Sequence, residues 1–242
     1  MRTVGVVQAR MGSTRLPGKA LADIGGQPLI AWTLDAMTAV RGLDGLIVAI
    51  TDEPGDDELA AFVVAQGHRL HRGSTHDVLT RCWEAVEPLR PDVIVRETAD
   101  NPFVDPEIVA AQVRHLVEGG YDYVGTAGWP LGIAAEVASA TALGSAVIEA
   151  TDAAEREHVM PFLYARPERF RIGSLAPASP PPAGRFTVDT VDDLAFARAI
   201  AQRIGGHGPT TIAELGAILA DEPALTDLNR GVRQKAWQES ER

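Results

Sequence analysis

The chain opens with a strand that leads directly into a loop rich in glycine and cations. Residues 3–7 form an apolar run typical of a buried strand. The loop that follows, residues 8–19, reads Gln-Ala-Arg-Met-Gly-Ser-Thr-Arg-Leu-Pro-Gly-Lys. Backbone N–H groups in a glycine-rich turn, together with fixed positive charge, are well suited to hold a polyphosphate. The pattern therefore predicts an α/β protein with a phosphate-binding loop after its first strand.

Two common phosphate-loop signatures are absent. The Walker A loop places four residues between its glycines, whereas five separate Gly12 from Gly18, and Ala20 stands where Ser or Thr would hold a metal. The dinucleotide fingerprint G-x-G-x-x-G is also missing. A surface loop with scattered basic residues is the simplest alternative. The convergence of glycine, serine, arginine and lysine directly after the first strand argues against it.

Strand-like and helix-like segments alternate along most of the chain. This alternation predicts a mostly parallel sheet covered on both faces, with ligands at the carboxyl ends of the strands. Strands are expected at 3–8, 45–51, 68–72, 92–98, 121–126, 135–139, 170–176 and 185–188. Helices are expected at about 28–40, 56–66, 77–87, 106–118, 191–203, 211–220 and 224–239.

Composition limits the class of protein. The 242 residues, 45% of them hydrophobic, suit one large α/β domain. A net charge of -11 argues against broad nucleic-acid binding, so the N-terminal cations form a local site for a small anion. No apolar stretch approaches the ~20 residues of a membrane span. Cys82 is the only cysteine and is expected to be a packed thiol. With no signal-peptide pattern, a cytoplasmic protein is expected.

The loop resembles the signature Q-A-R-x-G-S-x-R-L-P-G-K of the cytidylyltransferases that make CMP-activated sugars. This family includes the 3-deoxy-manno-octulosonate and acylneuraminate enzymes, and the likeness is closest to the spore-coat polysaccharide branch. The resemblance implies a Rossmann-like nucleotidyltransferase fold with a single domain over residues 1–242. It also implies a small inserted lobe at approximately 128–185 for acceptor binding and dimerisation, and hence a homodimer.

The resemblance assigns a nucleotide site to two segments. Arg10, Arg15 and Lys19 would offset the charge of the triphosphate and serve as catalytic residues. The segment from Arg72 to Arg81 resembles R-G-S-x-x-D-V-L-x-R and would approach the base or ribose. Arg81 itself is expected to pair with Asp77 on a helix surface at the i,i+4 spacing. The expected nucleotide-binding residues are Gln8, Ala9, Arg10, Gly12, Ser13, Arg15, Lys19, Arg72, Gly73, Ser74 and Asp77.

Two aspartates are candidate Mg²⁺ ligands. Asp100 follows a strand, a suitable position for a carboxylate that holds the metal of a metal–triphosphate complex, and the family has a metal-binding Asp there. Asp189 lies in a segment that resembles R-x-T-V-D-T-x-x-D-L, where related enzymes place a second metal-binding carboxylate. A turn or helix cap is the alternative for Asp189. Asp105, Asp192 and Asp193 are better explained as residues that stabilise helix starts.

Two further segments suggest an acceptor pocket. Residues 129–137 resemble Y-P-x-G-x-x-x-E-V, with Trp129 in place of the tyrosine, and residues 156–159 resemble R-E-H-V. The resemblance makes Glu136, Arg156 and His158 candidates for binding a hydroxyl or carboxylate of the acceptor. For His158, a packed or helix-surface histidine is an equal alternative.

The sequence therefore predicts an enzyme that transfers CMP from CTP to an acidic sugar or similar anion and releases pyrophosphate, with Mg²⁺ as cofactor. Three alternatives remain open: a phosphonate or phosphorylated polyol as acceptor, another nucleoside triphosphate as donor, and a nucleotide-binding regulatory protein without turnover.

Overall fold

A central sheet organises the part of the chain that the computed structural model describes, residues 1–205 and 208–234. The seven strands of this sheet lie in the order β5-β4-β1-β6-β8-β7-β9. Only β8 runs antiparallel to its two neighbours, so the predicted mostly parallel sheet is confirmed. The strands are β1 (Thr3–Gln8), β4 (Gly45–Thr51), β5 (Arg69–Gly73), β6 (Val93–Thr98), β7 (Tyr123–Thr126), β8 (Glu136–Ser139) and β9 (Ile172–Leu175), with a separate hairpin of β2 (Asp23–Ile24) and β3 (Gln27–Pro28).

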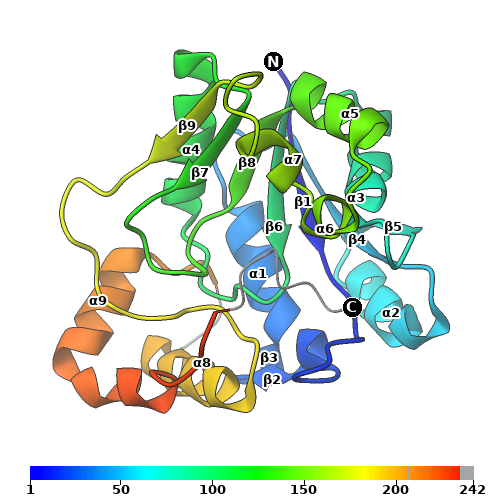
Figure 1. The fold of residues 1–242 in the computed structure, drawn as a ribbon. Helices are drawn as coiled ribbons and strands as arrows, with labels where there is room; N and C mark the ends of the chain where they lie inside the picture. The colour runs from blue at the N-terminus through cyan, green and yellow to red at the C-terminus, as the bar shows by residue number, and fades with distance from the viewer. Residues whose placement is uncertain (206–207, 235–242) are drawn as a thin grey trace.

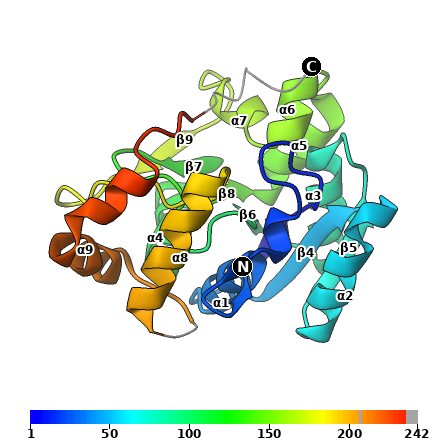
Figure 2. The ribbon, with the colours of Figure 1, turned by 90° about the horizontal axis from the view of Figure 1, so that it is seen from below.

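Helices cover both faces of this sheet (Figures 1 and 2). Side chains of α1, α2 and α4 form one core layer, and those of α3, α5 and α7 form the layer on the opposite face. A third cluster joins α8 and α9 to the first layer through Trp32, Phe103 and Phe186. The helices are α1 (Leu29–Thr38), α2 (Asp57–Ala65), α3 (Val78–Val86), α4 (Pro106–Gly119), α5 (Ala140–Glu149), α6 (Ala153–His158), α7 (Pro161–Tyr164), α8 (Val191–Ile204) and α9 (Ile212–Asp221).

Strand β1 lies in the middle of the sheet because its side chains are apolar on both faces. Val4 and Val6 pack into the layer beneath α3, whereas Val7 packs into the layer beneath α1. This is the two-residue alternation of a strand buried on both sides. Its neighbours β4 and β6 run parallel to it. The loop after β1 therefore starts at the carboxyl edge of the sheet, as the sequence predicts.

Two expected elements take a different form. Residues 185–188 are not a strand but an extended segment with a single parallel bridge, Leu131 to Arg185. The next ladder bond is lost because the Val188 amide donates to the carbonyl of Asp100, which lies in a turn. The helix expected at 224–239 is instead a 3₁₀ helix, η4 (Pro223–Leu228), and a turn follows it. Residues 235–239 lie outside the described chain.

The region expected to form an inserted lobe contributes directly to the sheet. Its strands β8 and β9 pair with β6 and β7, and its helix α5 packs against α3. Its role in acceptor binding and dimerisation stays a prediction. Cys82 is fully buried in α3 with a free thiol, and this burial raises its pKa. None of the helices in the described residues is long and apolar enough to cross a membrane.

Candidate active site

The glycine-rich loop is pinned to the neighbouring strand by a buried aspartate. Asp56 accepts a hydrogen bond from the Met11 amide at 2.8 Å, and its other oxygen accepts from the amide and hydroxyl of Thr51. The loop then closes on itself, because the Gly18 amide donates to the Met11 carbonyl at 3.0 Å. Gly18 has a φ of 75°, in the left-handed region that favours glycine. This turn brings Lys19 back toward the sheet.

The ammonium of Lys19 joins the two predicted metal ligands. Its Nζ donates to Asp100 Oδ2 at 2.7 Å, to Asp189 Oδ1 at 2.9 Å and to the carbonyl of Val188 at 2.9 Å. Burial by itself would lower the pKa of Lys19, but the charges and hydrogen bonds of the two aspartates raise it above its ordinary value. Burial likewise opposes ionisation of Asp100, and Lys19 nevertheless holds the pKa of Asp100 below its usual range.

Three neighbouring charged residues hold Asp189 in position beside Lys19. Its Oδ2 accepts a hydrogen bond from Arg185 at 2.6 Å and forms an ion pair with Arg15 at 3.2 Å. Its backbone amide donates to Asp193, which is buried and also accepts from Arg185. The cap of α8 is Thr190, which forms a capping box with Asp193. The carboxylate of Asp189 is therefore not the helix cap, whereas the predicted helix-start role of Asp193 is confirmed.

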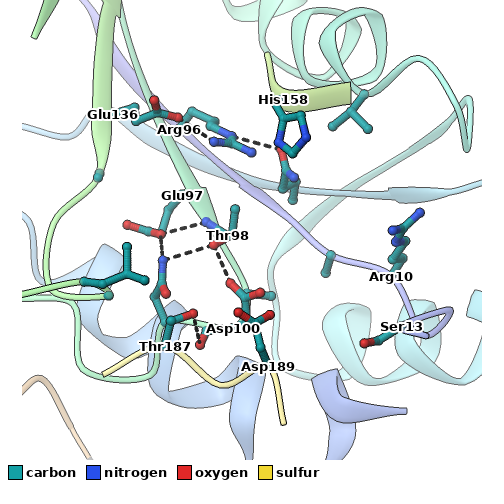
Figure 3. A pocket seen from close by; sticks show the side chains of 18 of the residues that line it. Arg10, Ser13, Arg96, Glu97, Thr98, Asp100, Glu136, His158, Thr187 and Asp189 are labelled. Atoms are coloured by element: carbon teal, nitrogen blue, oxygen red, sulfur yellow. Dashed lines mark hydrogen bonds and ion pairs between the residues drawn. The ribbon is translucent and has the colours of Figure 1, made fainter. Parts of the chain in front are cut away.

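A cavity of about 590 Å³ opens at the carboxyl edge of the sheet around these groups. This volume is within the usual range for a small-molecule site. Figure 3 shows Arg96, Glu136 and His158 across the pocket from Asp100 and Asp189. The predicted residues that line it are Gln8, Ala9, Arg10, Ser13, Arg15, Lys19, Asp100, Glu136, His158 and Asp189.

Six predicted site residues do not line this cavity: Gly12, Arg72, Gly73, Ser74, Asp77 and Arg156. The guanidinium of Arg72 faces the start of α2, where it donates to Asp57 at 2.6 Å and to two backbone carbonyls. Asp77 caps α3 and lies 3.4 Å from the Nε of Arg156. Arg156 also donates to the carbonyl of Val147. Roles for these residues in binding stay predictions.

Arg81 is a cavity residue that the sequence led us to place on the surface. The expected pair with Asp77 does not form, and Nη1 of Arg81 donates to the carbonyl of Ser74 instead. The side chain is buried, and its Nε has no hydrogen-bond partner among the described residues. Burial lowers the pKa of this guanidinium. The sequence signal was the last arginine of the R-G-S-x-x-D-V-L-x-R segment, whose direction depends on how α3 packs.

A partly buried chain of polar side chains connects Gln8, predicted to bind the nucleotide, with Glu136, predicted to bind the acceptor. Arg96 donates from Nε to the side chain of Gln8 at 3.0 Å and from Nη1 to Glu136 at 2.5 Å. The hydroxyl of Tyr123 donates to the other oxygen of Glu136 at 2.9 Å. Beside this chain, burial lowers the pKa of His158, so its imidazole is neutral at pH 7. Arg96, which follows three apolar residues within β6, was the signal that sequence reasoning missed.

Glu97, next to Arg96, is a buried acid held close to Asp100. Its Oε1 accepts from the Thr98 amide and from the side chain of Asn101, whereas its buried Oε2 has no partner among the described residues. Burial raises the pKa of Glu97 to about 8. Glu97 is therefore protonated at neutral pH. It orders Thr98, whose hydroxyl donates to Asp100.

The donor set at the cavity floor suits a hard divalent cation. No group of three or more potential metal ligands occurs in residues 1–205 and 208–234. Mg²⁺, however, is commonly bound through one or two carboxylates together with water and substrate phosphates. Asp100 and Asp189 supply two carboxylates that converge on one point, the Lys19 nitrogen.

The comparisons with known proteins agree with this geometry. A cytidylyltransferase family profile matches residues 4–202. The chain belongs to the cytidylyltransferase family. It is 36% identical, over 90% of its length and 94% of the other, to the spore coat polysaccharide biosynthesis protein SpsF of Bacillus subtilis. It is 40% identical to a 3-deoxy-manno-octulosonate cytidylyltransferase of an Anaeromyxobacter species over half of each protein.

Solved structures of similar fold extend over most of this cytidylyltransferase. A cytidylyltransferase of Leptospira borgpetersenii superimposes with a TM-score of 0.88 at 23% identity over 97% of this chain and 100% of the other. A CMP:2-keto-3-deoxy-manno-octonic acid synthetase complexed with CTP superimposes with a TM-score of 0.67 at 18% identity, over 84% of this chain and 100% of the other. Rv0371C of Mycobacterium tuberculosis in complex with manganese superimposes with a TM-score of 0.60 at 21% identity, over 82% of this chain and 99% of the other. The predicted nucleotidyltransferase fold is confirmed.

Proposed function

We propose that this cytidylyltransferase transfers CMP from CTP to a hydroxyl of an acidic sugar or similar anion and releases pyrophosphate. The observation that carries the proposal is one cavity with two chemically different ends. Arg10, Arg15 and Lys19 of the loop line it, and Lys19 pairs with Asp100 and Asp189. Arg96 and Glu136 lie across the pocket from these two aspartates (Figure 3). The names of the related 3-deoxy-manno-octulosonate enzymes support a sugar acid as acceptor.

The chain's own residues act through position and charge. Arg10, which forms no ion pair with a described residue, is available to the triphosphate, and Lys19 and Arg15 stabilise the charge that builds on the departing pyrophosphate. The Arg96–Glu136–Tyr123 chain orients the acceptor, whose oxygen attacks the α-phosphorus in line with the leaving group. Asp100 and Asp189 would hold Mg²⁺, which supplies Lewis-acid stabilisation of the phosphate charge when bound.

Calorimetry with CTP, UTP, ATP and GTP in the presence of Mg²⁺ tests the donor. A pocket that hydrogen-bonds the edge of cytosine rejects UTP, because the wrong base leaves buried groups unpaired. Pyrophosphate release with CTP is then measured against a panel of sugar acids, phosphonates and phosphorylated polyols. Tight CTP binding without turnover on any acceptor would favour a regulatory nucleotide-binding protein, and equal binding of all four nucleotides would contradict the choice of CTP.

We also infer that the protein acts as a cytoplasmic homodimer. The resemblance to the family supports a dimer formed through residues 128–185, and CTP is a cytoplasmic nucleotide. Sedimentation equilibrium of the purified chain measures the oligomeric state. Fractionation of cells that express the chain measures its location. A monomer at micromolar concentration would contradict the dimer.

A further inference from the structure

The ammonium of Lys19 lies at the point where Asp100 and Asp189 converge. An ammonium has three N–H donors, and in Lys19 each is used: one on each aspartate and one on the Val188 carbonyl. The group is well shielded, with 14% of the side chain of Lys19 and 14% of that of Asp189 exposed. Lys19 is thus a counter-cation built into this carboxylate pair.

The remaining carboxylate oxygens are also engaged. Asp100 Oδ1 accepts from the hydroxyl of Thr98. Asp189 Oδ2 accepts from Arg185 and forms an ion pair with Arg15. Each carboxylate oxygen of this pair therefore already accepts a hydrogen bond. A divalent cation that approaches the pair also meets a positive charge between the two aspartates. Two cations in contact with the same carboxylates repel strongly in a shielded site, where salt screens little.

The triphosphate offers Lys19 another partner in the same cavity. Lys19 lines that cavity together with Arg10 and Ser13 of the loop. A lysine is a compact charge on a flexible four-carbon stem, so its nitrogen can move from a carboxylate to a phosphate oxygen without displacement of the backbone. Once the ammonium leaves, both aspartates are open to the metal that accompanies the triphosphate.

We propose that Lys19 closes the Asp100–Asp189 pair to divalent metal until a nucleoside triphosphate draws the ammonium away, so that metal binding depends on the nucleotide. The proposal rests on the function proposed above only in naming these two aspartates as the metal ligands. It makes Lys19 a residue that sets the order of binding in addition to its role toward the phosphates. Metal and triphosphate then bind with positive coupling, because each favours the same arrangement of Lys19.

The test measures Mn²⁺ binding to the full chain without nucleotide, with the electron paramagnetic resonance signal of free Mn²⁺ as the readout. Lys19→Met should bind Mn²⁺ at least roughly tenfold more tightly than the wild type, because the competing charge is gone. Arg15→Met is the matched control, since it removes a cation from Asp189 without vacating the point between the aspartates. It should raise Mn²⁺ affinity far less. Asp100→Asn added to Lys19→Met should abolish the gain, which locates the ion at this pair.

A second variant covers the case in which Lys19→Met fails to fold. Lys19→Gln removes the charge but keeps a hydrogen-bond donor, and circular dichroism confirms that each variant is native. Equal Mn²⁺ affinity in the wild type and both Lys19 variants would overturn the proposal, as would a gain that survives Asp100→Asn. Because no nucleotide is present, these outcomes are independent of CTP turnover, whose failure in the pyrophosphate assay would instead overturn the proposed function.

Discussion

The backbone amide of Val188 donates to the carbonyl of Asp100 at 2.8 Å. This bond joins the turn after β6 to the extended segment before α8. Asp100 is one partner in this bond, and Asp189 is the residue after the other partner. The carboxylates of both aspartates contact the Lys19 nitrogen. The geometry of the proposed metal pair therefore depends on how one irregular segment, 185–188, is seated in the fold.

Replacing either aspartate should remove most activity. Asp100→Asn and Asp189→Asn each delete a charge from the proposed metal pair, and kcat should fall by roughly 10²–10³-fold, the scale for loss of one preorganised electrostatic group. CTP affinity measured without metal should not fall, because Lys19 is then held less tightly by the aspartates. Asp192→Asn, on the exposed first turn of α8, is the matched control. Near wild-type kcat for Asp189→Asn across Mg²⁺ concentrations would reduce Asp189 to a structural residue.

A glycine that lines the cavity but carries no reactive group should control the position of Asp189. Gly132 has a φ of 93°, and a Cβ there would lie 2.5 Å from the amide nitrogen of Thr187, within segment 185–188. Gly132→Ala should displace this segment and lower kcat by about 10²-fold, as expected for a misplacement near 1 Å. Gly128→Ala introduces similar backbone strain, at a φ of 77°, but contacts only Pro177. Steady-state pyrophosphate release should separate the two variants; equal losses would contradict this mechanism.

Arg81 should contribute to nucleotide binding at a cost in stability. Its buried guanidinium lacks a carboxylate partner among the described residues, so Arg81→Met removes a desolvated charge and should leave the melting temperature unchanged or raised. CTP affinity should fall by roughly 10- to 100-fold, the loss of one hydrogen bond to a charged group. Arg72→Met, at a residue outside the cavity, should cost much less. Calorimetric CTP binding compares them, and a larger loss for Arg72→Met would restore the sequence-based assignment.

Glu97 should make stability depend on pH. The folded protein keeps the Glu97 proton up to about pH 8, whereas the unfolded chain releases it near the ordinary pKa of 4.5. The free energy of unfolding should therefore fall as pH rises between these values, by up to ~1.4 kcal/mol per pH unit. Glu97→Gln should remove this slope, and Glu118→Gln, exposed on α4, should keep it. Urea unfolding at several pH values measures the slope in both variants. A slope unchanged in Glu97→Gln would refute a raised pKa of Glu97 as its cause.

Local sequence signals predicted the scaffold closely. The apolar runs at 3–8 and 45–51 match β1 and β4 residue for residue, because a central strand needs apolar side chains on both faces. Asp105 caps α4 as predicted, accepting from the amides of Glu107 and Ile108. Such caps are set by residues within one turn of each other. The 185–188 prediction failed because the Val188 amide bonds to Asp100, a turn residue, so the bridge at Leu131 is not extended into a ladder.

The sequence by itself determined the mostly parallel sheet, the place of the glycine-rich loop after β1 and the family, since these follow from local periodicity and from one contiguous motif. Only the tertiary structure decided which charged side chains meet. Lys19 reaches aspartates 81 and 170 positions away, Arg81 lines the cavity rather than pairing with Asp77, and Arg72 and Arg156 do not line it. Arginine and lysine side chains are long and can reach several partners, so the packing of helices and loops at the strand ends selects one.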